Sequence, residues 1–100
     1  MSDDSAWLDA RIAGAPPRLA ERARHFAGVA AGDEPGERLA AAGLRALEAA
    51  ESLGRDRAAA LDLLAADALI TLALLETAER EPGRLAVTAA ELRRQAAEGR

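Results

Sequence analysis

The sequence predicts an all-α protein, and three observations carry that prediction. Alanine and leucine, the best helix formers, dominate the chain, whereas aromatic residues make up only 2% of it. Prolines open three similar segments, at Pro16-Pro17, Pro35 and Pro82, as is typical of a first helical turn. Apolar side chains then recur every three or four residues. We therefore expect one domain over residues 1–100, a small antiparallel bundle of four to five helices.

Start and stop signals place the helices. Glycines end the first three, and Asp56 is expected to cap the fourth with its side chain, as Asp33 and Glu34 cap the third. Thr88 and the three residues after it match a capping box, but an apolar stripe runs straight through them, which favours one continuous last helix. The expected ranges are 5–13, 17–31, 35–53, 57–81 and 84–98.

Charge and cysteine content exclude several classes of protein. The net charge is −4 and the chain lacks cysteine, so disulfides, thiolate nucleophiles and cysteine-based zinc sites are absent. All 13 basic residues are arginine, which together with the alanine and glycine content indicates a GC-rich, bacterial genome. An acidic chain with scattered arginines does not predict nucleic-acid binding. The acidic start at Asp3 and Asp4 is unlike a signal peptide, so a cytoplasmic location is expected.

Because alanine dominates the apolar residues, we expect a small free energy of unfolding. Each alanine buries little area, so the core depends on the leucines and a few larger side chains. In the third expected helix the buried stripe is predicted to run from Leu39 through Gly43 and Ala46 to Leu53. Association with a second copy or with another protein would compensate for such a core. A homo-oligomer is the expected state, with no cofactor.

The expected helix 57–81 is the most apolar part of the chain and should lie at the centre of the bundle. Between Ala58 and Leu75 it carries only Asp62 and Asp67 as charges. Its apolar length is marginal for a membrane span, and two acidic residues near its middle are costly in lipid. We therefore expect a buried helix of the bundle and no membrane contact.

The two aspartates fall on different sides of this helix at about 100° per residue. Asp62 groups with Glu76 and Arg80 on a narrow polar side, which we expect to be solvated. Asp67 falls inside the arc of leucines, with Thr71 one turn later. Asp67 could pair with an arginine or a helix N-terminus from another segment, it could be a functional carboxylate in a cleft or metal site, or it could face solvent through a gap between helices.

One pattern resembles a known family. Glu48-Ala49-Ala50-Glu51 is followed, after twelve residues, by Leu64-Ala65-Ala66-Asp67. This resembles the magnesium-binding arrangement of all-α nucleoside triphosphate pyrophosphatases, the MazG-like family. Leu64 stands where that family has an acidic residue, the chain has no lysine, and Glu48 and Glu51 project on the polar flank of their helix. The resemblance implies a degenerate relative that binds magnesium through Glu48, Glu51 and Asp67.

Catalytic groupings are otherwise missing, so the preferred hypothesis is a non-catalytic interaction or oligomerisation module. Trp7, on the first short helix, either packs over the bundle as a lid or anchors a partner, since tryptophan is favoured at interfaces. Leu44 projects beside Glu48, away from the main stripe, and marks a second candidate contact. The alternative hypothesis is the degenerate pyrophosphatase.

Overall fold

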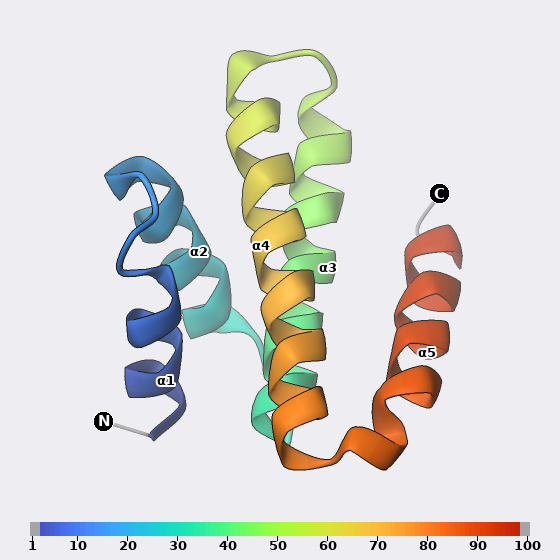
Figure 1. Cartoon of the computed structure of the whole chain (residues 1–100). Coiled ribbons are helices and arrows are strands. Elements are labelled where there is room, and N and C mark those ends of the chain that lie inside the picture. The colour runs from blue at the N-terminus through green and yellow to red at the C-terminus, as the bar shows by residue number, and fades with distance from the viewer. Residues whose placement is uncertain (1–2, 99–100) are drawn as a thin grey trace.

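The computed structural model describes residues 3–98, and these residues form five α-helices and one 3-10 turn, without a strand (Figure 1). The all-α prediction is therefore confirmed. The elements are α1 (Asp3–Ile12), α2 (Pro17–Val29), α3 (Pro35–Leu53), α4 (Arg57–Arg80), η1 (Pro82–Arg84) and α5 (Leu85–Glu98).

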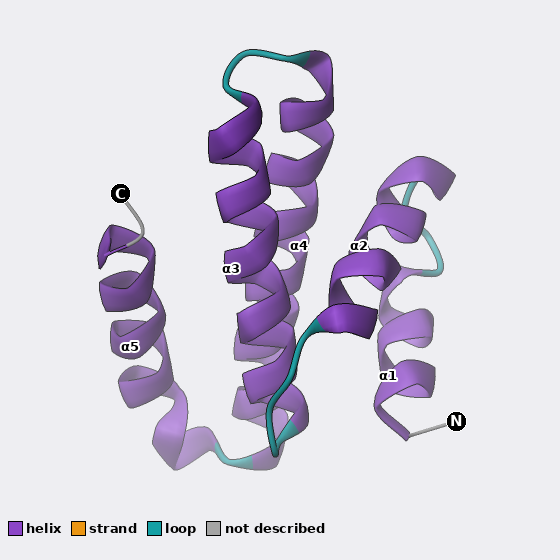
Figure 2. Ribbon diagram, turned by 180° about the vertical axis from the view of Figure 1, so that it is seen from behind, coloured by secondary structure: helices purple, strands orange, loops and turns teal. Residues whose placement is uncertain are grey.

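A long antiparallel hairpin of α3 and α4 forms the centre of the molecule. These two helices make the most extensive contact in the structure, and α4 also meets α2 and α5. Figure 2 shows the α1–α2 pair on one side of this hairpin and α5 on the other. The α5 helix is loosely attached, since Leu92 is its one buried residue in the part of the chain that the structure describes. The expected central position of the fourth helix is confirmed.

Local signals explain most of the helix ends. The Asp56 carboxylate accepts a hydrogen bond from the Ala58 N–H at 3.0 Å, as predicted, and caps α4. Gly54 takes a φ of 64° where α3 ends, a conformation that glycine adopts most readily. Thr88 lies inside α5, so the last helix is continuous, as expected. The α2 helix ends at Val29, two residues earlier than expected.

The predicted side-chain cap of α3 is wrong. Glu34 occupies the N-cap position but accepts no capping hydrogen bond there, because its carboxylate receives a hydrogen bond from Arg80 at 2.9 Å. The Glu37 carboxylate instead turns back and accepts a hydrogen bond from the Asp33 N–H at 3.3 Å. The contact between Glu34 and Arg80 ties the start of α3 to the end of α4.

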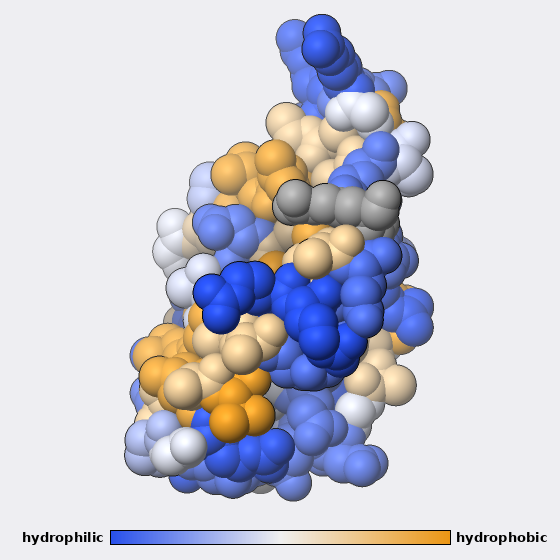
Figure 3. Space-filling model, turned by 90° about the vertical axis from the view of Figure 1, so that its right-hand side faces the viewer, coloured by the Kyte–Doolittle hydropathy of each residue, from blue (hydrophilic) through white to orange (hydrophobic). Residues whose placement is uncertain are grey.

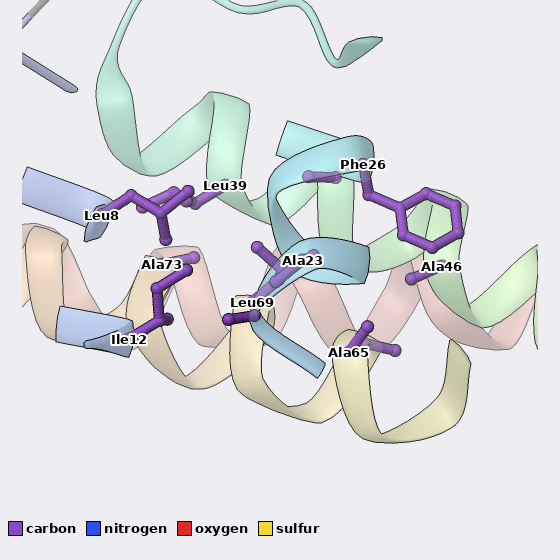
Figure 4. Packing of buried hydrophobic residues seen from close by; sticks show 12 residues of the cluster. Leu8, Ile12, Ala23, Phe26, Leu39, Ala46, Ala65, Leu69 and Ala73 are labelled. Atoms are coloured by element: carbon purple, nitrogen blue, oxygen red, sulfur yellow. The ribbon is translucent and has the colours of Figure 1, made fainter. Parts of the chain in front are cut away.

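Alanines make up most of the buried apolar core, and few large side chains join them. Figure 4 shows α1, α2 and α3 meeting α4 around Leu69. Leu53, expected in the buried stripe of α3, is 40% exposed because it lies at the tip of the hairpin. The large buried apolar side chains are Leu8, Ile12, Phe26, Leu39, Leu69 and Leu92.

Two glycines let α3 and α4 approach each other closely. A Cβ atom at Gly43 would lie 2.6 Å from Cγ1 of Ile70 and 3.4 Å from the carbonyl oxygen of Ala66. A Cβ atom at Gly36, two turns earlier, would lie 2.7 Å from Oε2 of Glu76. Both glycines are buried, so their lack of a side chain sets the separation of the two helices.

Replacing Gly43 by alanine is expected to destabilise the fold. The alanine gains up to about 1 kcal/mol of helix propensity, but overpacking against Ile70 costs about 1–3 kcal/mol, so the melting temperature should fall. Gly28→Ala is the matched control, because nothing lies within 4 Å of a Cβ atom at this exposed position of α2. That control should raise the melting temperature. Thermal unfolding followed by circular dichroism measures both, and a shift of the same sign in the two variants would contradict the close approach.

Candidate interaction surface

The structure reverses the predicted roles of the two aspartates of α4. Asp62 was expected on a solvated face, but it is 1% exposed and faces α2. Asp67 is exposed, as the third of the possibilities left open for it required, but it lies on an open side of the helix and not in a gap between helices. The grouping of residues around the helix is as predicted, and the assignment of the inner side is wrong. The alanine-rich side of α4 faces the bundle, and the leucine-rich side faces outward.

Asp62 is buried as one half of an ion pair. Nε of Arg22, on α2, donates to its Oδ1 at 2.5 Å, and Nη2 donates to Oδ2 at 3.3 Å. The guanidinium also lies 4.7 Å from the ring centroid of Phe26, which orders it further. The hydrogen bond to Asp62 raises the pKa of Arg22 above its ordinary value. Two-point contact of this kind fixes the position of α2 on α4.

Most leucines of α4 lie outside the core. The helix contains seven leucines, and Leu69 is the one that is buried. Leu63 and Leu64 are 54% and 55% exposed, and Leu75 is 37% exposed. We call the outward side of α4 the outer face; at about 100° per residue it spans about 120° of the helix. Its residues are Ala60, Leu63, Leu64, Asp67, Thr71, Leu74, Leu75 and Ala78.

The outer face is apolar except at its centre, where Asp67 and Thr71 lie one turn apart. Figure 3, seen from the α5 side, shows apolar surface along the edge of the molecule on which α4 lies. By length and composition α4 could cross a membrane, and 33% of its most apolar segment is buried within the structure. The prediction of a buried central helix therefore holds for one side only.

A cleft of about 680 Å³ separates α5 from the α3–α4 hairpin. Glu76, one of its lining residues, is 6% exposed and forms an ion pair with Arg80, whose Nε lies 2.7 Å from Oε1. Arg80 also binds Glu34, so the three side chains form a charged chain between the two helices. Leu44 and Glu48 line the same cleft, where Leu44 is half-buried.

The structure does not bring together the residues of the predicted magnesium site. Glu48 lines the α5 cleft, and Asp67 lies on the outer face of α4. Glu51 is exposed on α3, near the tip of the hairpin. Across residues 3–98, no group of three or more acidic, histidine or cysteine side chains is placed to hold a metal ion.

Trp7 is half-buried and packs against the core, which places it as a lid on the bundle. The Arg11 guanidinium lies 5.2 Å from the centroid of the indole ring, and it forms an ion pair with Glu79 of α4 at 2.9 Å. These contacts attach α1 to the end of the hairpin. A role for Trp7 in binding a partner stays a prediction, as does one for Leu44.

Removing Arg22 should destabilise the fold because the buried carboxylate of Asp62 would lose its partner. Arg22→Met should lower the free energy of unfolding by about 2 kcal/mol, less than for a fully buried pair, since the arginine side chain is 36% exposed. Adding Asp62→Leu should recover most of that loss.

The matched control is Arg24→Met, which removes an exposed ion pair with Asp9 and should change stability by no more than about 0.5 kcal/mol. Urea unfolding measures all four proteins. Equal losses for the two arginine variants would contradict the role assigned to the buried pair.

Comparisons with family models, with curated proteins and with solved structures find no match to this chain. The most unusual feature of the molecule's surface is the row of exposed leucines along the outer face of α4.

Proposed function

We propose that this chain is a small, non-catalytic interaction module that associates with a second copy through the outer face of α4. The exposed leucines support this proposal. Complete burial of a leucine contributes about 1.5–3 kcal/mol, so covering three that are each about half exposed would contribute several kcal/mol per protomer. A group of exposed leucines around a small polar centre is typical of an interaction site.

The total surface of the chain also supports association. Its accessible area is 6321 Å², whereas a compact monomer of 10.4 kDa is expected to expose about 5,400 Å². The radius of gyration, 12.9 Å, is ordinary for 100 residues, so an extended shape does not account for the extra area. The excess, about 900 Å², is close to the 800 Å² or so that each partner contributes to a standard interface.

Other partners fit the outer face less well. A lipid bilayer would have to accept Asp67 in the middle of the apolar stripe, which is costly. A nucleic acid would require basic side chains, and the outer face has none while the net charge is −4. A protein surface can offer a hydrogen-bond donor to the carboxylate and cover the leucines at the same time.

Leu64→Glu tests the proposal. Sedimentation equilibrium of the unaltered chain should show a mass above 10.4 kDa that rises with concentration. The variant should raise the Kd of association at least about tenfold, since it replaces a buried leucine with a charge. Val29→Glu is the matched control, because Val29 is 53% exposed on α2, away from the outer face, and should leave Kd unchanged.

Two results would contradict the proposal. One is a chain that stays monomeric up to millimolar concentration. The other is an association that Leu64→Glu and Val29→Glu weaken equally. Binding to phosphatidylcholine vesicles that only the Leu64 variant loses would assign the outer face to a membrane instead.

A further inference from the structure

The outer face has nearly the same sequence of side chains from either end. Its residues lie in pairs at equal distances above and below the level of Leu69. At about 100° per residue, the members of each pair also lie equally far from the midline of the face, on opposite sides of it or both on it. Moving outward, the pairs are Asp67 and Thr71, Leu64 and Leu74, Leu63 and Leu75, and Ala60 and Ala78.

Because of this order, antiparallel packing of two such faces about the level of Leu69 places leucine beside leucine and alanine beside alanine. In a twofold interface the same patch of both copies is used, so that if one residue contacts a second, the second contacts the first in return. We infer that the outer faces of two copies pack antiparallel, with the twofold axis at the level of Leu69. This inference rests on the proposed function and specifies its geometry.

The centre of the face discriminates between orientations. Antiparallel packing places Asp67 opposite the partner subunit's Thr71, whose hydroxyl can donate a hydrogen bond to the carboxylate. Parallel packing in register would place the two Asp67 carboxylates together, which is repulsive. Neither Asp67 nor Thr71 uses its side chain in a hydrogen bond or ion pair within residues 3–98, so both are available.

The ends of the face favour the same orientation. Arg57, the first residue of α4, and Glu81, its C-cap residue, are also equally distant from Leu69, and both are exposed; Glu81 also forms an exposed ion pair with Arg84 at 3.9 Å. The antiparallel arrangement brings Arg57 close to the partner subunit's Glu81, twice per dimer. A parallel pair would instead place arginine beside arginine and glutamate beside glutamate.

Spacing along the face suits close helix packing. Its central positions, 60, 64, 67, 71, 74 and 78, are alternately four and three residues apart, the pattern of a coiled-coil seam. Leu64 and Leu74 in this seam set an interaxial distance nearer about 10 Å than 8 Å. Leucines beside the seam would cover its flanks.

Cysteine cross-linking tests the orientation, because the chain has no cysteine of its own. The antiparallel register places position 60 beside position 78 of the other copy. Ala60→Cys and Ala78→Cys chains, mixed and mildly oxidised, should form a disulfide-linked heterodimer. Either variant alone should form little covalent dimer, since its two sulfur atoms would lie about 27 Å apart along the helices.

Charge reversal provides a second test that does not require cysteines. Arg57→Glu and Glu81→Arg should each raise the Kd of the dimer about three- to tenfold, and the double variant should restore it. The two residues are about 36 Å apart in one chain, so restoration requires a contact between chains. Thr71→Val should also raise Kd about tenfold, because it leaves the partner subunit's Asp67 without a donor.

The outcomes separate this inference from the proposed function. Efficient homodimer cross-linking of Ala60→Cys alone, in a dimer that Leu64→Glu still weakens, would overturn the antiparallel register and leave the interaction module in place. The antiparallel register would also be overturned if the double variant of Arg57 and Glu81 raised Kd further than either single variant instead of restoring it. A monomeric chain would overturn both.

Discussion

The close approach of α3 and α4 is the constraint on which the rest of the structure depends. Small residues repeat every seven positions along both helices, Gly36, Gly43 and Ala50 on one and Ala59, Ala66 and Ala73 on the other, and all six are buried. Their size lets backbone and Cβ atoms touch across the interface, so the hairpin packs at short range. Because only small residues fit between the helices, the alanine side of α4 faces inward, and the leucines are left to other partners.

This constraint explains how far the sequence predicted the fold. Composition, prolines and glycines suffice for the helix class and for most boundaries, because those are local properties. The inner side of α4 is decided by its neighbour, and a prediction that buries the largest apolar side chains selects the opposite face. The seven-residue spacing of Gly36 and Gly43 was the sequence signal for the inner side. Two glycines on one helix face indicate a close crossing that a leucine would prevent.

Because the leucine-rich side of α4 faces outward, the residues of the candidate site also differ from those expected. Sequence spacing placed Asp67 correctly among leucines, yet the pattern cannot say whether those leucines are covered, which depends on how many helices the chain supplies. Asp62 shows the converse case: its face looks polar because it also carries Glu76 and Arg80, yet the alanines between these residues are buried. The burial of Asp62 becomes tolerable once Arg22 reaches it from α2 at 2.5 Å, a partner 40 residues away that no local pattern reveals. The charged pair then holds α2 on the inner side and leaves the outer face open.

The proposed association would be coupled to folding. A core made largely of alanine contributes little burial per residue, so a chain of this size has a small margin of stability by itself. Its largest remaining source of apolar burial is the row of leucines that the hairpin turns outward. Covering them in a complex stabilises the folded chain by mass action, because the unfolded chain presents no continuous helix face to bind. The packing that keeps the core small is thus the packing that turns the leucines of α4 outward and provides the proposed interface.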